Sequence, residues 1–400
     1  MDQQSSPSHV PVDRVVDFDM YAPPGVAEDF FEAWGTLQQP GVPDIVWTPR
    51  NGGHWIATRA EVIKEVLSDF SRFSSRNILL PKSTSDEHDL IPTTIDPPQH
   101  HFYRKTLNST FAPAAVNRMD DRIREIVTDL IDQFEDKGQC NFTEEFAEIL
   151  PIRIFLSMMD LPEEDTPQTK YWADQLLRPD GSITFAEALN NLKQYITPYV
   201  DERSGKDGTD LLSRLVNSEI DGREITRDEA IKLAVQVFIA GIDTVVNLLG
   251  FVFLFLAKNP AHRNQLVEGT VPLSESIEEI LRRFPVVCIG REVREDINFH
   301  GVTLKAGEMI ATPTPLAGID DRFNSEPKTV DFARKTKNSL TFGTGAHICP
   351  GKTLARAELR ITLEEWMKRI PDFSVDPDST VTCTGGIVGV VDNLSLVWNR

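Results

Sequence analysis

The chain contains the segment FGTGAHICPG at residues 342–351, which leads into a helical pattern at residues 354–370. Three glycines in this segment allow backbone geometry that a β-carbon would forbid. The loop can therefore lie flat against a large planar ligand and present the thiol of Cys349 at its end.

Cys349 stands just before a helix, where the N-terminal amides and the helix dipole favour a thiolate over a thiol. Pro350 and Gly351 lead into that helix, and proline is well tolerated at a helix start. A buried structural cysteine is the alternative, because free cysteines are commonly buried. The flanking glycines and Phe342 favour a ligand.

The 400 residues contain 40% hydrophobic and 26% charged residues, which is ordinary for a soluble globular protein. No linker or low-complexity run divides the chain, so we expect a disordered lead at residues 1–10 and a single domain at residues 11–400. The net charge of −20 argues against a nucleic-acid partner.

The longest apolar run, residues 237–257, is long enough to cross a bilayer but contains Asp243 and Thr244. We therefore expect a buried core helix and no membrane association. The four cysteines are widely spaced, which favours a reducing, cytoplasmic environment and no zinc site.

A capping box at Thr226 and Glu229 predicts the start of a long helix that ends at Lys258, before Asn259-Pro260. Because this helix is apolar nearly all round, we expect it to run through the interior. The remaining patterns predict a mainly α fold with a minor antiparallel β part. We expect further helices at residues 61–67, 119–134, 151–159, 185–200 and 276–284, and strands at residues 55–59, 297–313 and 386–398, with hairpins around His300-Gly301 and Ala306-Gly307.

The long helix is interrupted by polar residues at AGIDT, residues 240–244. Gly241 weakens a helix by about 1 kcal/mol relative to alanine, and a buried Asp243 carboxylate is costly unless it is paired. Thr244 has a structural explanation, since a threonine hydroxyl can bond the carbonyl one turn earlier and bend the helix. The residues alone leave function and structure open here.

Two other charged patterns have ordinary alternatives. Glu279 and Arg282 can pair on one helix face, as many surface residues do. His100 and His101 are adjacent on a helix and do not face the same way, so we discount a metal pair.

Phe342, Gly345, Cys349 and Gly351 match the Phe-x-x-Gly-x-x-x-Cys-x-Gly heme loop of the cytochrome P450 family, with His347 at its usual basic position. The resemblance implies the P450 fold, with heme b between the long central helix and the cysteine-loop helix. It also implies that Cys349 is the axial ligand of the heme iron, whose thiolate helps to cleave the O–O bond.

The resemblance extends to the AGIDT segment, which matches the family's oxygen-binding helix. It implies that Gly241 makes room for dioxygen, that Thr244 holds a proton donor, and that Asp243 relays protons from solvent. Glu279 and Arg282 would be the family's buried pair, completed by Arg334, which holds the heme loop.

Heme propionates need cationic or hydrogen-bonding partners. Matching positions in the family imply His100, Arg104, Arg291 and His347.

From about residue 10 to residue 398 the chain resembles the bacterial camphor hydroxylase group, in segments such as NGGHWIATR at residues 51–59 and GQCNFTE at residues 138–144. The implied reaction inserts one atom of dioxygen into an unactivated C–H bond. Electrons would come from NADH through a ferredoxin reductase and a [2Fe–2S] ferredoxin.

The segment at residues 332–360 contains six basic residues and only one acidic residue, Glu358. This basic face could dock the ferredoxin, or it could be a solvated surface that also anchors the heme carboxylates. Pro350 departs from the group where partner contact is expected, and it offers the thiolate no N–H. The six basic residues are Arg334, Lys335, Lys337, Lys352, Arg356 and Arg360.

The substrate pocket also departs from the camphor enzyme. His88 replaces the tyrosine that bonds the camphor carbonyl, Leu79 replaces a phenylalanine, and Gln236 replaces an apolar residue. The resemblance therefore predicts a small apolar ketone, a terpenoid or norisoprenoid of the ionone kind that is larger than camphor. The other pocket candidates are Leu90, Thr93, Ile239, Ala240, Val287, Ile387 and Val388.

Three alternatives remain open. The chain could be a camphor hydroxylase proper, a peroxide-driven heme enzyme, or a non-catalytic heme-thiolate sensor or carrier. Asp243 and Thr244 disfavour peroxide use, because that reaction needs no proton relay to dioxygen. We expect a monomer.

Overall fold

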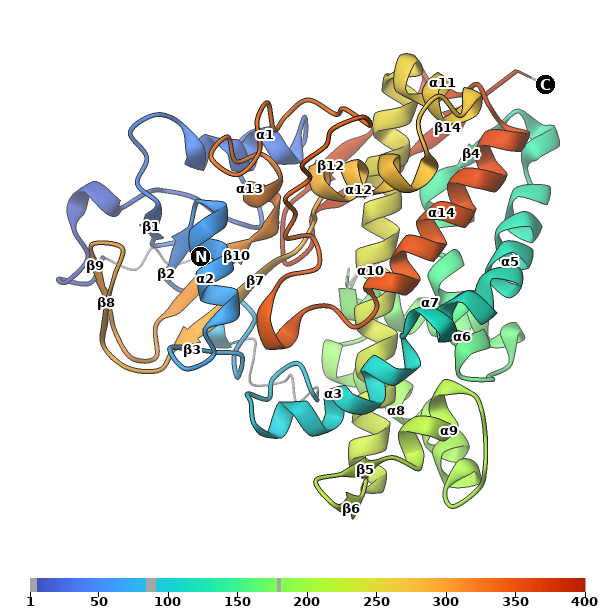
Figure 1. Cartoon of the computed structure of the whole chain (residues 1–400), viewed down its shortest axis with the longest axis horizontal. Helices are drawn as coiled ribbons and strands as arrows, with labels where there is room; N and C mark the ends of the chain where they lie inside the picture. Colours follow the sequence, from blue (N-terminus) through green and yellow to red (C-terminus); the bar gives the residue numbers. More distant parts are fainter. Residues whose placement is uncertain (1–5, 84–90, 178–180, 400) are drawn as a thin grey trace. The chain divides into compact units, whose positions relative to one another are not determined.

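The computed structural model of the chain describes residues 6–83, 91–177 and 181–399 (Figure 1). Its contacts form two compact units, each assembled from separated segments. The strand-rich unit comprises Met1–His88, Gly269–Cys349 and Thr380–Asp392, and the helical unit comprises Asp89–Glu268, Pro350–Ser379 and Asn393–Arg400. The sequence indicated no boundary of this kind.

The helical unit is built around α10 (Arg227–Lys258), a helix of 32 residues. Thr226 and Glu229 form the predicted capping box, in which each side chain bonds the other residue's backbone N–H. Both ends of the helix are confirmed. The unit further contains α3 (Gln99–Thr110), α4 (Pro113–Val116), α5 (Asp120–Asp132), α6 (Leu150–Met158), α7 (Thr166–Leu177), α8 (Phe185–Arg203), α9 (Leu211–Val216), α11 (Pro260–Glu268) and α14 (Lys352–Arg369), with short strands β4 (Gln139–Asn141), β5 (Glu219–Ile220), β6 (Arg223–Glu224), β11 (Ser374–Val375) and β14 (Ser395–Val397).

The α10 helix lies in the core of the helical unit, as its composition predicts. It packs against α6, α7, α8, α9 and α11. Its C-terminal half joins an aromatic cluster in which Phe253 stacks on Phe142 at 4.2 Å between ring centroids and meets Trp366 edge-on at 4.8 Å. By length and composition α10 could cross a membrane, but 67% of its most apolar window is buried within the protein. A core helix accounts for this pattern.

The strand-rich unit contains a five-stranded sheet in the order β1-β2-β10-β7-β3. One pair, β10 with β2, is parallel and the others are antiparallel, so the predicted antiparallel part is in fact mixed. The elements are β1 (Ile45–Thr48), β2 (His54–Ala57), β3 (Phe73–Ser74), β7 (Cys288–Val293), β8 (Ile297–Phe299), β9 (Val302–Leu304), β10 (Met309–Pro313), β12 (Thr382–Thr384) and β13 (Val390–Asp392), with helices α1 (Phe30–Gly35), α2 (Ala60–Ser68), α12 (Leu273–Arg283) and α13 (Thr314–Gly318).

Two expectations for the strand-rich unit differ from the structure. The hairpin around His300-Gly301 is confirmed as β8–β9, but β10 pairs with β7 and β2 and forms no hairpin at Ala306-Gly307. In the lead at residues 1–10, Val10 is buried and His9 Nε2 lies 2.9 Å from Glu308 Oε1. These contacts are long-range, so no local pattern revealed them.

Glu279 and Arg282 on α12 are fully buried and hydrogen-bonded, at 2.7 and 2.9 Å. Arg334 adds a third contact to Glu279 at 3.0 Å. The surface-pair interpretation is therefore wrong for these residues. Burial raises the pKa of Glu279, but hydrogen bonds and charges from Arg282 and its neighbours lower it below the usual 4.5.

Replacing Glu279 with alanine should lower the free energy of unfolding by roughly 3–5 kcal/mol, because two buried guanidinium groups lose their carboxylate. Chemical denaturation measures this loss. The control is Glu275→Ala, which removes a carboxylate that is 57% exposed and pairs with Lys337 at 2.7 Å. That change should cost roughly 0.2–1 kcal/mol.

Comparing Glu279→Ala with the wild-type protein also tests how the stability contributed by Glu279 depends on pH. The folded pKa of Glu279 lies below its unfolded value, so its stabilisation is present above about pH 4.5 and is lost as the pH falls through the folded pKa. The difference in stability between wild type and Glu279→Ala should therefore shrink in acid. A constant difference from neutral pH to strong acid would contradict this account.

Candidate functional site

The cysteine loop belongs to the strand-rich unit and is held by its own backbone. The amide of Cys349 donates to the Phe342 carbonyl at 2.9 Å, and the amide of Ile348 donates to Gly345 at 3.2 Å. A 3-10 turn, Gly345–His347, lies between them. Cys349 is partly exposed, whereas the other three cysteines are buried. Cys349 therefore differs from the other three cysteines in its surroundings.

Gly345 is required where it stands. Its φ is +72°, and a β-carbon added there would lie 2.8 Å from the Leu67 carbonyl oxygen and 2.8 Å from the Ser68 α-carbon. Gly343 has a similar φ of +65° but open space around it. Only at Gly345 does the loop pass so close to α2 that no side chain fits.

A hydrogen bond ties this loop to α12. The hydroxyl of Thr341 donates to the Leu281 carbonyl, next to the buried Arg282. Arg282 also donates to the carbonyls of Gly318 and Thr329 at 2.8 and 3.0 Å. The charged network therefore fixes the chain that leads into the cysteine loop.

The polar residues of α10 belong to the helical unit. The hydroxyl of Thr244 donates to the Ala240 carbonyl at 3.0 Å, which is the back-bond expected from the sequence. Asp243 is buried at 8% exposure, and its Oδ1 accepts a hydrogen bond from Asn247 Nδ2 at 2.8 Å. The sequence analysis missed Asn247, although its spacing of four residues from Asp243 places both on one helix face.

One face of α10 consists of small residues. Ala240 and Gly241 are exposed on a helix that is otherwise largely buried, and no atom lies within 4 Å of a β-carbon built on Gly241. A flat apolar group can approach this face closely. Within the strand-rich unit, the partly exposed thiol of Cys349 on its glycine loop is the kind of ligand that a thiolate-ligated heme needs.

The four candidate partners for heme carboxylates divide between the units. His100 and Arg104 lie one turn apart on α3, and both are buried. Burial, with the nearby Arg104 and His101 charges, lowers the pKa of His100 to about 4, so it is neutral at pH 7. Arg291 is buried on β7, and His347 lies in the cysteine loop.

His101 is exposed while its neighbour His100 is buried, so the two side chains lie on different faces of α3. Among the described residues, no three His, Cys, Asp or Glu side chains gather as a metal site.

Three of the predicted pocket residues come together in the strand-rich unit, and a fourth, Leu79, lies in a segment bonded to the same strand. Val287 forms a β-bridge with Val388, and the amide of Cys288 donates to the Ile387 carbonyl at 2.7 Å. Leu79 is buried in the segment whose Ile78 carbonyl accepts from Gly290 at 2.7 Å. That these residues line a substrate pocket stays a prediction.

The other described candidates lie in the helical unit. Gln236, Ile239 and Ala240 follow one another on α10, and Thr93 precedes α3. The Gln236 amide oxygen is buried with no hydrogen-bond partner among the described residues. His88 and Leu90 lie outside the described residues.

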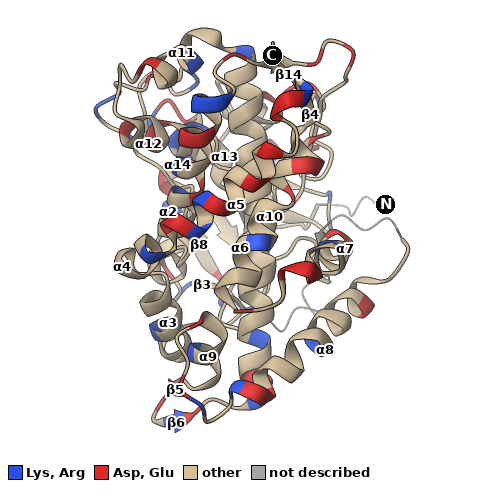
Figure 2. Cartoon of the chain, turned by 90° about the vertical axis from the view of Figure 1, so that its right-hand side faces the viewer, with Lys and Arg blue, Asp and Glu red and all other residues tan. Residues whose placement is uncertain are grey.

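The predicted basic face carries less uncompensated positive charge than its six basic residues indicate. Arg334 is bound to Glu279, Lys337 pairs with Glu275 at 2.7 Å, and Arg360 pairs with Glu364 and Asp120. On the helical unit, Lys and Arg are interspersed with Asp and Glu (Figure 2). Half of the six residues are therefore neutralised by partners within the protein.

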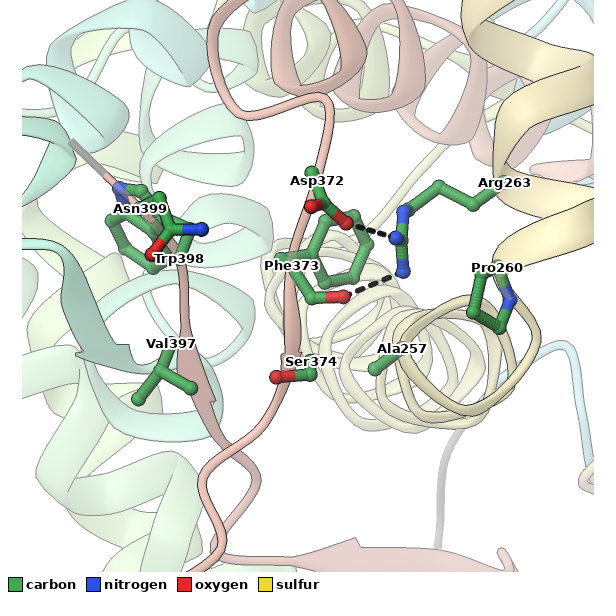
Figure 3. Close-up of a pocket in the computed structure, with 9 residues that line it drawn as sticks. All are labelled: Ala257, Pro260, Arg263, Asp372, Phe373, Ser374, Val397, Trp398 and Asn399. Carbon is green, nitrogen blue, oxygen red and sulfur yellow. Dashed lines mark hydrogen bonds and ion pairs between the residues drawn. The ribbon is translucent and has the colours of Figure 1, made fainter.

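A hollow of about 330 Å³ lies elsewhere in the helical unit, beside Ala257 and Arg263 (Figure 3). Arg263 is buried and donates to the carbonyls of Pro371 and Phe373 and to the Asp372 carboxylate. Arg263 also donates to the Leu256 carbonyl near the end of α10 at 3.3 Å, so its N–H groups are engaged within the fold and it offers little to a ligand.

Comparison with known proteins agrees with this geometry. A family model described as "Cytochrome P450" matches residues 168–270 and 272–383. "Probable cytochrome P450 127A1" of Sinorhizobium fredii is 31% identical over 98% of this chain and 96% of its own length. "Erythromycin C-12 hydroxylase" of Saccharopolyspora erythraea is 31% identical over 89% of this chain and 91% of its own. The crystal structure of CYP101J2 has a TM-score of 0.93 and 41% identity, covering 99% of this chain and 100% of that one.

A heme-thiolate oxygenase is the class that this fold and these residues define. The chain belongs to the cytochrome P450 family. It is accordingly a monooxygenase that carries heme b, as the resemblance implied.

Replacing Gly345 with alanine should destabilise the loop by roughly 2–4 kcal/mol, because backbone strain adds to a collision with the α2 backbone. The heme content of the purified protein should fall. The matched control is Gly343→Ala, which brings similar strain without the collision and should cost roughly 1–2 kcal/mol. Equal heme content in the two variants would contradict the role assigned to Leu67 and Ser68.

Proposed function

We propose that this P450 hydroxylates an unactivated C–H bond of a terpenoid or norisoprenoid ketone, ionone-like and larger than camphor. The observation that carries this proposal is that Val287, Ile387 and Val388 are brought together by backbone pairing, with the buried Leu79 in a segment bonded to the same strand, β7. A branched apolar substrate fits such a wall, and leucine in place of phenylalanine leaves more room. A hydrogen bond from Gln236 to the ketone would come from its Nε2 amide group, because its buried Oε1 and the ketone oxygen are both acceptors.

In this proposal Cys349 holds the heme iron, and His100, Arg104, Arg291 and His347 hold the propionates. When bound, the heme supplies dioxygen activation, assisted by electron donation from the thiolate. The loop glycines Gly345 and Gly351, with Phe342, give the backbone its close approach. His100 can donate an N–H to a carboxylate in either protonation state, and the two guanidinium groups supply positive charge.

Asp243 and Thr244 deliver protons in this proposal, and Gly241 leaves space beside them. The Thr244 O–H donates to Ala240, so its oxygen lone pairs are oriented to accept a hydrogen bond from a proton donor. Asn247 fixes one carboxylate oxygen of Asp243 and with it the orientation of the acid. Proton transfer by a positioned acid of this kind typically contributes 10²–10⁴-fold to rate.

Electrons come from NADH through a ferredoxin reductase and a [2Fe–2S] ferredoxin in this proposal. Among the six basic residues, Arg334, Lys337 and Arg360 are held by carboxylates of the protein, so Lys335 before the cysteine loop and Lys352 at the start of α14 are better suited to an acidic partner. The protein acts as a cytoplasmic monomer.

The substrate class is tested by recording the ferric optical spectrum during titration with β-ionone and, separately, with camphor. A low-spin to high-spin shift is expected with β-ionone and little shift with camphor, because displacement of water from the iron requires a ligand that fills the pocket. A full shift with camphor would instead identify a camphor hydroxylase. No product from either ketone with ferredoxin, reductase and NADH would favour a sensor or carrier.

Asp243→Asn should slow product formation roughly 10²-fold or more while leaving the β-ionone spin shift nearly unchanged, because only the proton-donating group is lost. The matched control is Asp228→Asn on the same helix, where the carboxylate is 73% exposed and pairs with Lys232. The rate of product formation during NADH-driven turnover measures both variants. Unchanged turnover in Asp243→Asn would remove this residue from the relay.

A further inference from the structure

We propose that Tyr21 is a positioning residue that holds Leu79 in place by locking its segment to the turn that carries Ile387 and Val388. This inference rests on the proposed function, in which these side chains line the substrate pocket. All of the contacts involved lie within the strand-rich unit.

The backbone of Leu79 is held on both sides. The carbonyl before it, on Ile78, accepts from the Gly290 amide at 2.7 Å. The carbonyl after it, on Leu80, accepts from the Tyr21 hydroxyl at 2.6 Å. The first bond ties the segment to β7, and the second is supplied by a single side chain from the N-terminal region, 59 residues away.

The backbone around Tyr21 is packed tightly against the turn that carries Ile387 and Val388. A β-carbon on Gly385 would lie 2.4 Å from the Met20 carbonyl oxygen and 2.8 Å from Pro23 Cδ, so no side chain fits between the turn and this backbone. At the other end of the turn, a β-carbon on Gly389 would lie 2.3 Å from the ring of Phe30. The chain around Tyr21 and the turn with Ile387 therefore behave as one body, to which the phenol links the Leu79 segment.

The link lies at a surface. Tyr21 is 39% exposed, whereas Leu79 and Leu80 are 6% and 1% exposed. Burial of part of the side chain and the nearby Asp19 carboxylate raise the pKa of the Tyr21 phenol, so it remains a hydrogen-bond donor throughout the neutral range. A hydrogen bond at the boundary of the solvent can break without disturbing the core, so its loss should loosen the Leu79 segment alone.

The test is Tyr21→Phe in the full-length holoenzyme, which removes one hydroxyl and keeps the ring. Tyr171→Phe is the matched control, because Tyr171 is 38% exposed and its hydroxyl lies 2.9 Å from Ser182 Oγ. Hydrogen–deuterium exchange reports on the Gly290 amide, whose acceptor lies on the locked segment. Its exchange should become roughly two- to twelvefold faster in Tyr21→Phe, the loss expected for one hydrogen bond, and should not change in Tyr171→Phe.

The second readout is the association and dissociation of phenylimidazole, a heme-iron ligand with an apolar ring, followed by stopped-flow absorbance. In Tyr21→Phe both rates should rise by a similar factor, because the Leu79 wall moves more easily. Unchanged Gly290 exchange together with unchanged rates would overturn the proposal, and a lower unfolding midpoint alone would identify a merely structural hydrogen bond. Failure of the proposed function appears separately, as the absence of a β-ionone spin shift in the wild-type protein.

Discussion

The buried carboxylate of Glu279 is the interaction on which the strand-rich unit depends. It accepts hydrogen bonds from Arg282, Arg334 and the Asp331 amide. The remaining N–H groups of Arg282 reach backbone carbonyls on α13 and on residues 327–329. Burying such a network contributes little net stability compared with apolar packing, but removing one member leaves charges uncompensated. Its effect is therefore to specify one arrangement of the chain that leads to Cys349.

The helical unit depends on a long apolar helix, α10, whose middle contains residues of low helix propensity. Gly241, Asp243 and Thr244 have low helix propensity, and the helix is held at its start by its capping box. Glu229 completes the capping box. It also accepts two hydrogen bonds from Arg223 and one from Tyr103 on α3. Hydrogen bonds from Arg223 lower the pKa of Glu229 despite partial burial. The same carboxylate thus anchors α10 and the helix that carries His100 and Arg104.

The sequence could predict the features that depend on residues close together in the chain. Both ends of α10 were predictable because a capping box and Asn259-Pro260 act on adjacent residues. The need for glycine at 345 was predictable as a motif, but the reason for it, the α2 backbone at Leu67, required the fold. Asn247 was within reach, since it lies one helical turn from Asp243.

The features that sequence reasoning missed join residues far apart in the chain. The parallel pairing of β10 with β2 and the contact of His9 with Glu308 have no local pattern. The same holds for the Tyr21 hydroxyl and the Leu80 carbonyl. The sequence count of basic residues also overestimated the positive charge of this surface, because the acidic partners of Arg334 and Arg360 lie on other elements.

These ion pairs bear on how an acidic electron donor would recognise this protein. At a net charge of −20 the two proteins repel each other at long range, and salt at physiological strength screens this repulsion beyond about 8 Å. Attraction must then come from contact between the partners. Arg334 and Arg360 are committed to internal carboxylates, so they contribute little to an incoming partner. Recognition would therefore depend on a few basic groups and on the shape of the loop around Pro350, which favours a specific partner over a generally basic docking surface.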